Sequence, residues 1–151
     1  MVRKKIKAAS TLLVGYFIPF SISPYMHLYY MFMHASLIHL LINIYAIFLC
    51  TKERTNLVHV YVLGVIASLL SQSDKPTLGA SGIVYIMLGM NVFGAWRPFL
   101  IGAAFTLFSC FMPGVNYKIH IISFIFGLIY SAIEREYKSY NEKREYIKGK
   151  R

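Results

Sequence analysis

The chain is built from apolar runs that are separated by short polar or charged breaks. Six of these runs predict helices, at residues 8–22, 28–50, 57–71, 78–96, 99–112 and 117–133. A helix needs about 20 apolar residues to cross a hydrocarbon core, and several apolar runs with charges at their ends are typical of multi-pass membrane proteins. The pattern predicts an all-α membrane protein, with six transmembrane helices in residues 1–134 and a basic cytoplasmic tail in residues 135–151.

The composition agrees with this pattern. Of the 151 residues, 57% are hydrophobic and 15% are charged, whereas about 25% of the residues of a typical soluble domain are charged. The length leaves room for one compact domain.

The net charge of +10 is distributed asymmetrically along the chain. The basic residues fall in the N-terminal segment, in the breaks after the second and fourth runs, and in the C-terminal segment; of the 16, only Lys75 and Lys118 lie elsewhere. Basic residues concentrate on the cytoplasmic side of a membrane, so both termini are predicted to be cytoplasmic. We expect a bacterial cytoplasmic membrane, a basic tail that touches anionic lipid, and no nucleic-acid partner.

Four of the polar residues inside the apolar runs stand out as a set: His39, Asn43, Ser81 and His120. Polar groups at membrane depth are costly and therefore indicate function. At 1.5 Å per residue, His39, Ser81 and His120 lie about 20–24 Å from the basic residues that end their runs. All three are then roughly 6–10 Å beneath the outer face of a core about 30 Å thick, and Asn43 lies one turn deeper than His39 on the same face.

Ser81 and His120 have the chemistry of a nucleophile and its general base. A serine hydroxyl reacts slowly until a base takes its proton, and imidazole does so at neutral pH. The acidic residues all lie outside the membrane level of the predicted helices: Glu53, Asp74, Glu134, Glu136, Glu142 and Glu145. The sequence therefore predicts a Ser-His dyad without an acidic third member.

The residues around Ser81 suit the negative oxygen that develops during acyl transfer. Ser81 starts a helix, where backbone N–H groups are free and the helix dipole favours negative charge. His39 and Asn43 add side-chain donors. Gly79 and Gly82 flank the serine, let the backbone bend and keep bulk away.

Small residues predict close packing of the fourth and sixth runs. Ser123, Gly127 and Ser131 recur every four residues in the sixth run, and such stripes let helices approach closely in lipid. Tyr85 lies one turn after Ser81 and is placed to stack on the imidazole of His120.

Together these motifs resemble those of the rhomboid intramembrane serine proteases. The matching segments are residues 34–43 (HASLIHLLIN), residues 79–85 (GASGIVY), and His120 with Gly127 seven positions later. The resemblance implies a six-transmembrane-helix rhomboid-like bundle. It also implies Ser81 as nucleophile, His120 as general base, and cleavage of single-pass transmembrane proteins near their outer ends.

The same resemblance implies roles for the surrounding residues. His39, Asn43 and the backbone of Ser81 would surround the oxyanion, and Tyr85 would pack on the imidazole. No metal and no cofactor are expected. The sequence carries no indication of the oligomeric state.

The chain departs from the family at two points. The family has glycine three residues after the catalytic histidine, and this chain has Ser123; the serine is expected to reduce the closeness of the helices rather than abolish activity. Many members carry a long loop with a Trp-Arg pair between the first two spans, whereas this chain has only residues 23–27 there.

Other interpretations stay open at this level. The main alternative is a non-catalytic rhomboid-like protein that binds transmembrane helices, although such relatives normally lack the serine or the histidine. A small transporter or channel is less favoured, because no paired acids and no internal repeat are present. His39 and Asn43 could form a structural interhelical pair, and His34, His39 and His120 a metal site.

Overall fold

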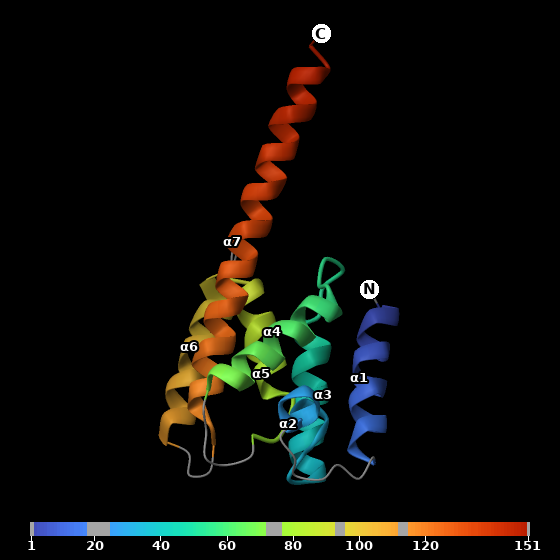
Figure 1. The fold of residues 1–151 in the computed structure, drawn as a ribbon, viewed down its shortest axis with the longest axis vertical. Helices are drawn as coiled ribbons and strands as arrows, with labels where there is room; N and C mark the ends of the chain where they lie inside the picture. Colours follow the sequence, from blue (N-terminus) through green and yellow to red (C-terminus); the bar gives the residue numbers. More distant parts are fainter. Residues whose placement is uncertain (1, 18–24, 72–76, 93–95, 112–114, 151) are drawn as a thin grey trace.

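The computed structural model describes residues 2–17, 25–71, 77–92, 96–111 and 115–150. Every regular element in these ranges is helical, so the all-α part of the fold prediction holds (Figure 1). The elements are α1 (Val2–Tyr16), α2 (Met26–Tyr29), the 3-10 turn η1 (Tyr30–Phe32), α3 (Leu37–Cys50), α4 (Leu57–Leu70), α5 (Ser81–Met90), α6 (Trp96–Phe111) and α7 (Tyr117–Lys148).

The prediction of six transmembrane helices is wrong. By length and composition, only α7 among the described helices can cross a membrane, or two segments if α2, η1 and α3 count as one broken span. The other apolar runs form helices that are too short: α4 has 14 residues and α5 has 10, against about 20 for a full crossing. The prediction was wrong because hydropathy identifies apolar runs but does not indicate how much of each run is helical.

The second predicted run illustrates the difference. It was expected to be one helix over residues 28–50, but the chain bends by 87° between Met26–Phe32 and Leu37–Cys50. Ser36 ends this break, because its side chain accepts a hydrogen bond from the backbone N–H of His39 and caps α3. The short connection predicted at residues 23–27 begins outside the described residues.

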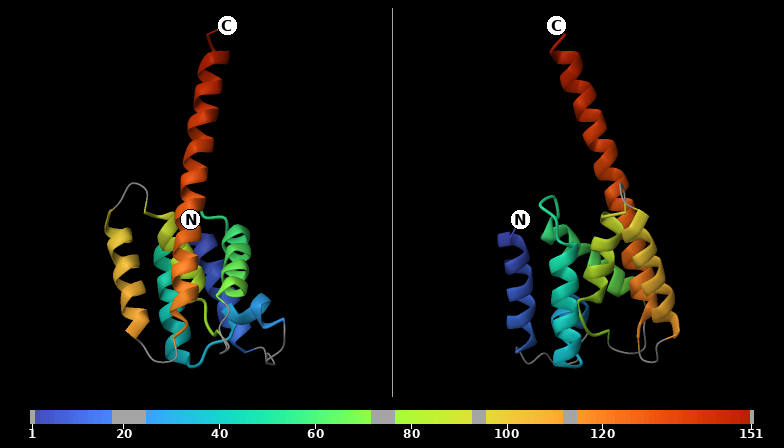
Figure 2. Two further views of the ribbon diagram at one scale, coloured as in Figure 1. Left: turned by 60° about the vertical axis from the view of Figure 1, so that its left-hand side comes forward. Right: turned by 180° about the vertical axis from the view of Figure 1, so that it is seen from behind.

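Helix α5 forms the centre of the molecule. Seven of its ten residues are buried, and it contacts α3, α4, α6 and α7. Figures 1 and 2 show it enclosed by these helices. A helix that is apolar on all sides is stable only when it is surrounded by other helices or by lipid, and this central position explains the apolar sequence of α5.

Helices α5 and α7 cross at two glycines. A Cβ atom at Gly127 would lie 2.1 Å from the carbonyl oxygen of Ile86, and one at Gly89 would lie 2.4 Å from the carbonyl oxygen of Phe124. The two glycine Cα atoms therefore face each other, and no larger residue fits at either position. This close crossing holds the first turns of the two helices beside each other.

Different segments of the chain lie at the two ends of the molecule. The first turns of α3, α5 and α7 lie at one end, whereas the start of α1, the turn between α3 and α4, and the second half of α7 lie at the other (Figures 1 and 2). The second half of α7 projects away from the remaining helices. The tail predicted to begin at residue 135 is therefore a continuation of α7, and the helix continues to Lys148.

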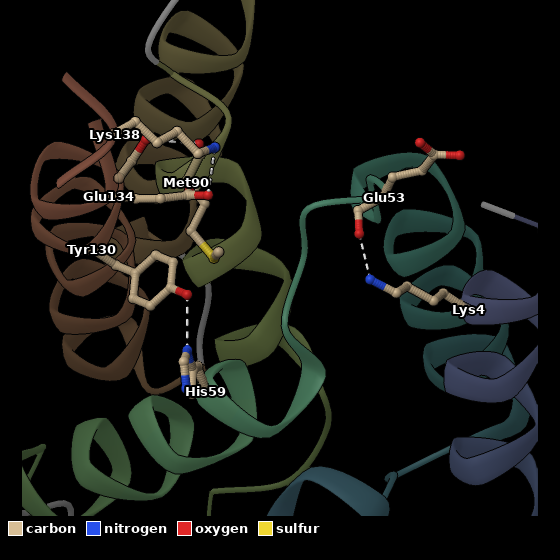
Figure 3. A network of polar contacts seen from close by, with 8 residues as sticks. Lys4, Glu53, His59, Met90, Tyr130, Glu134 and Lys138 are labelled. Carbon is tan, nitrogen blue, oxygen red and sulfur yellow. Dashed lines mark hydrogen bonds and ion pairs between the residues drawn. The ribbon is translucent and has the colours of Figure 1, made fainter. Parts of the chain in front are cut away.

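Polar contacts fasten the helices toward this second end (Figure 3). The Nδ1 atom of His59 on α4 lies 2.8 Å from the hydroxyl of Tyr130 on α7. Ser131 donates to the carbonyl oxygen of Met90 at 3.1 Å, and the Lys4 ammonium donates to the carbonyl oxygen of Glu53. These contacts join segments that are far apart in the sequence. The candidate site lies toward the opposite end, where α3, α5 and α7 begin.

Candidate active site

Three helix starts bring the candidate catalytic residues together. His39 lies in the first turn of α3, Ser81 is the first residue of α5, and His120 lies in the first turn of α7. The three helices start at the same end of the molecule (Figure 1), while the membrane depth expected for these residues stays a prediction.

Ser81 and His120 are in direct contact. The Oγ atom of Ser81 lies 2.9 Å from Nε2 of His120, which is hydrogen-bonding distance for a nucleophile and its base. His120 is buried, whereas Ser81 is partly exposed. The dyad therefore joins a partly exposed serine to a buried histidine.

Tyr85 fixes the plane of the imidazole. Its ring lies parallel to that of His120, with the ring centroids 4.3 Å apart and an angle of 17° between the planes. Tyr85 follows Ser81 by one turn of α5, so a single helix supplies both the nucleophile and the stacking ring. This contact orients Nε2 toward Ser81 Oγ.

Gly79 brings His39 and Asn43 close to the nucleophile. Its backbone has φ +104, a conformation that L residues rarely adopt. A Cβ atom there would lie 2.8 Å from Nε2 of His39 and 3.3 Å from Nδ2 of Asn43. Two side-chain nitrogens therefore pack against the backbone two residues before Ser81.

Asn43 has an unused donor at this place. The residue is buried, and its Nδ2 has no hydrogen-bond partner among the described residues. A buried amide without a partner is uncommon in a folded protein. It lies beside the backbone of Gly79, two residues before Ser81.

His34 is a residue of this site that sequence reasoning did not assign to catalysis. Its Nε2 accepts a hydrogen bond from the backbone N–H of Ala80 at 3.3 Å, and its ring lies 5.1 Å from that of His39. The Gly79 N–H donates to the carbonyl oxygen of Tyr30 at 3.1 Å. These contacts anchor the segment that leads into Ser81. In the sequence, His34 was noted only in the segment that resembles the family and as a possible metal ligand.

Gly82 provides the space on the other side of the dyad. A Cβ atom on Gly82 would lie 2.7 Å from the hydroxyl of Tyr30 and 3.3 Å from Oγ of Ser123. Both hydroxyls are buried, and Tyr30 donates to the carbonyl oxygen of Gly64 at 3.1 Å. A glycine at this position lets α5, α7 and η1 meet directly behind Ser81.

The alternative of a metal site receives no support from the described part of the chain. No group of three or more histidine, cysteine or acidic side chains in these ranges could hold a metal ion. The structure thus brings together all the residues singled out from the sequence: Ser81, His120, His39, Asn43, Gly79, Gly82, Tyr85 and, at the helix crossing, Gly127.

Comparison with known proteins adds no relative. No protein-family model matches this chain, and no curated protein matches its sequence. Function is therefore inferred from the arrangement of the side chains.

Proposed function

We propose that this protein is an intramembrane serine protease of the rhomboid type, with Ser81 as nucleophile and His120 as general base. The observation that carries the proposal is the 2.9 Å contact between Ser81 Oγ and His120 Nε2, made while the imidazole is stacked on Tyr85. A nucleophile, an oriented base and nearby donors are the parts that acyl transfer requires.

The dyad would act in two steps. In the first, Ser81 Oγ attacks the carbonyl carbon of a peptide bond while Nε2 of His120 takes the hydroxyl proton. The proton then passes to the departing amine, the carbon–nitrogen bond breaks, and an ester to Ser81 remains. In the second, His120 takes a proton from water, and the water oxygen attacks the ester carbonyl. The carbon–oxygen bond to Ser81 then breaks, His120 returns the proton to Ser81 Oγ, and the product leaves as a carboxylic acid that ionises in water.

The negative oxygen of each tetrahedral intermediate would be stabilised by nearby donors. Nδ2 of Asn43 is free to donate, and the backbone N–H of Ser81 lies at the first turn of α5, where intrahelical acceptors are missing. His39 packs against the backbone of Gly79, two residues before Ser81, and would donate as well. Donors that are already in place lower the barrier more than donors that must reorient.

A membrane location is supported by the surface of the helices. Ile121, Ile125, Ile129 and Ile133 form an exposed apolar stripe along α7, and α3 and α6 expose further large apolar side chains. Soluble monomers rarely expose apolar surface on several helices, so lipid is the natural environment. The basic segments lie at the end away from Ser81 (Figure 1), which would place that end in the cytoplasm and the dyad toward the outer face.

The substrates would be single-pass transmembrane proteins that are cut near their outer ends. The direct test is cleavage of a model transmembrane helix, with a small residue near its outer end, by the protein in liposomes. We expect product from the wild type and none from Ser81→Ala. Equal cleavage by both would refute the role of Ser81, and binding of the helix without cleavage by the wild type would favour the non-catalytic alternative.

A further inference from the structure

Two buried polar atoms next to the dyad have no hydrogen-bond partner in the described part of the chain. They are Nδ1 of His120 and Oγ of Ser123. Ser123 is fully buried, and His120 is 7% exposed. Buried polar groups are normally paired, so two such atoms one helical turn apart require an explanation.

The contact with Ser81 bears on which imidazole nitrogen of His120 carries the hydrogen. For His120 to act as the base, Nε2 must accept a hydrogen bond from the Ser81 hydroxyl 2.9 Å away, so the neutral imidazole then carries its hydrogen on Nδ1. A buried N–H group without an acceptor would favour the other tautomer, in which Nε2 is protonated and cannot act as the base. The catalytic form therefore needs an acceptor for the Nδ1 hydrogen.

Ser123 is placed to help supply this acceptor. It follows His120 by three residues on α7, and residues at this spacing are neighbours on one face of a helix. The hydroxyl oxygens of Tyr30 and Ser123 lie 2.7 Å and 3.3 Å from where a Cβ on Gly82 would stand, so they are no more than 6.0 Å apart, a separation that one water can bridge. Tyr30 already donates to Gly64, so its oxygen can still accept.

We propose that Ser123, together with the Tyr30 hydroxyl, positions the catalytic imidazole through one buried water that accepts the Nδ1 hydrogen of His120. The water would have three polar partners, which is the usual number for a buried water. The inference rests on the proposed function of the dyad. It assigns to two hydroxyls the orienting role that an acidic residue has in a triad.

This arrangement gives a role to Ser123, the residue at which the chain differs from the family that it resembles. Glycine stands at this position in that family, and it brings no polar group to the base. Here the serine adds a buried hydroxyl directly after the catalytic histidine along the helix face. Ser123 therefore acts as a positioning residue and makes no contact with substrate.

The test compares the full-length wild type with Ser123→Ala and Ser123→Gly, which both remove the hydroxyl without adding volume. Ser131→Ala is the matched control, since it removes a buried serine hydroxyl of the same helix that donates to Met90. The first readout is nitrogen NMR of histidine-labelled protein, with the His120 signals assigned by their loss in His120→Gln. The second is the rate at which a fluorophosphonate probe forms an adduct with Ser81.

We expect His120 in the wild type to carry its hydrogen on Nδ1, and both Ser123 variants to shift toward the other tautomer. Their adduct formation should fall about tenfold, the rate equivalent of one hydrogen bond, while Ser131→Ala changes neither readout. An unchanged tautomer in the two Ser123 variants would overturn the inference, and so would an unchanged rate. The NMR readout needs no turnover, so a wild type that forms no adduct would refute the dyad while the role of Ser123 is still decided.

Discussion

At the scale of the residue, the proposed catalytic dyad depends on few side chains. Nε2 of His120 lies 2.9 Å from the Ser81 hydroxyl, and the ring of Tyr85 stacks on the imidazole. Gly79 lets His39 and Asn43 pack against the backbone just before the nucleophile. Each residue has one task, so single substitutions should have separable effects.

Asn43→Ala is expected to slow cleavage on the order of a hundredfold, the usual loss for one donor to an oxyanion. Activity should remain measurable, because the backbone of Ser81 and the side chain of His39 still donate. Steady-state cleavage in liposomes checks this, and the decrease should appear in kcat rather than in KM.

Asn91→Ala provides a matched control for this substitution. Asn91 is also buried, and it donates to the carbonyl oxygen of Cys50 at the other end of α5. We expect that variant to lose stability but to keep its rate per folded molecule. If Asn43→Ala keeps the full wild-type rate, Asn43 is a structural residue only.

The sequence indicated these residues because their types are unusual in apolar segments. A serine between glycines, a histidine and an asparagine four residues apart, and a second histidine stand out where polar groups are expensive. The hydroxyls of Tyr30 and Ser123 and the contact of His34 with Ala80 did not stand out in the same way. Their importance depends on which helices meet, and this cannot be read from spacing along one chain.

At the scale of the element, the crossing of α5 and α7 determines the geometry of the dyad. The stripe of Ser123, Gly127 and Ser131 correctly indicated a close helix contact, and the structure shows its partner at Gly89. The lengths of the helices were harder to predict. Neither the 87° bend before α3 nor the ten-residue length of α5 follows from apolar runs, because both depend on tertiary contacts.

Gly127→Ala should separate α5 from α7. The added Cβ would meet the carbonyl oxygen of Ile86, and overpacking of this kind costs about 1–3 kcal/mol. We expect a lower melting temperature in detergent. Adduct formation at Ser81 should fall as well, because the two residues of the dyad lie on the two separated helices.

Gly149→Ala at the end of α7 is the control, since the nearest atom to its added Cβ is 3.6 Å away, an ordinary contact. This variant should melt at the wild-type temperature. Equal melting temperatures for both glycine variants would show that the crossing is looser than the structure indicates.

At the scale of the whole molecule, the apolar surface and the placement of charge favour a lipid environment. The exposed isoleucines of α7 and the apolar side chains of α3 and α6 face outward. The basic N-terminal segment and the basic second half of α7 lie toward the same end of the molecule (Figure 2). The expectation of six complete crossings was incorrect, and the orientation expected from the distribution of charge stays a prediction.

The protein is therefore expected to stay with the membrane fraction after washing with alkaline carbonate and to be released by detergent. Carbonate removes proteins that are held only by charge, so the basic tail alone would not retain the chain. Release of the protein by carbonate would contradict an integral membrane location and would favour a peripheral one.

The most direct test of the catalytic dyad is the site of a fluorophosphonate adduct, located by peptide mass spectrometry after labelling of the folded protein in lipid. We predict a single adduct on Ser81 in the wild type and none in His120→Ala, because the hydroxyl is not activated without its base. Absence of an adduct on wild-type Ser81, or equal labelling of Ser81 in the His120→Ala variant, would contradict the proposal that these two residues form a catalytic pair.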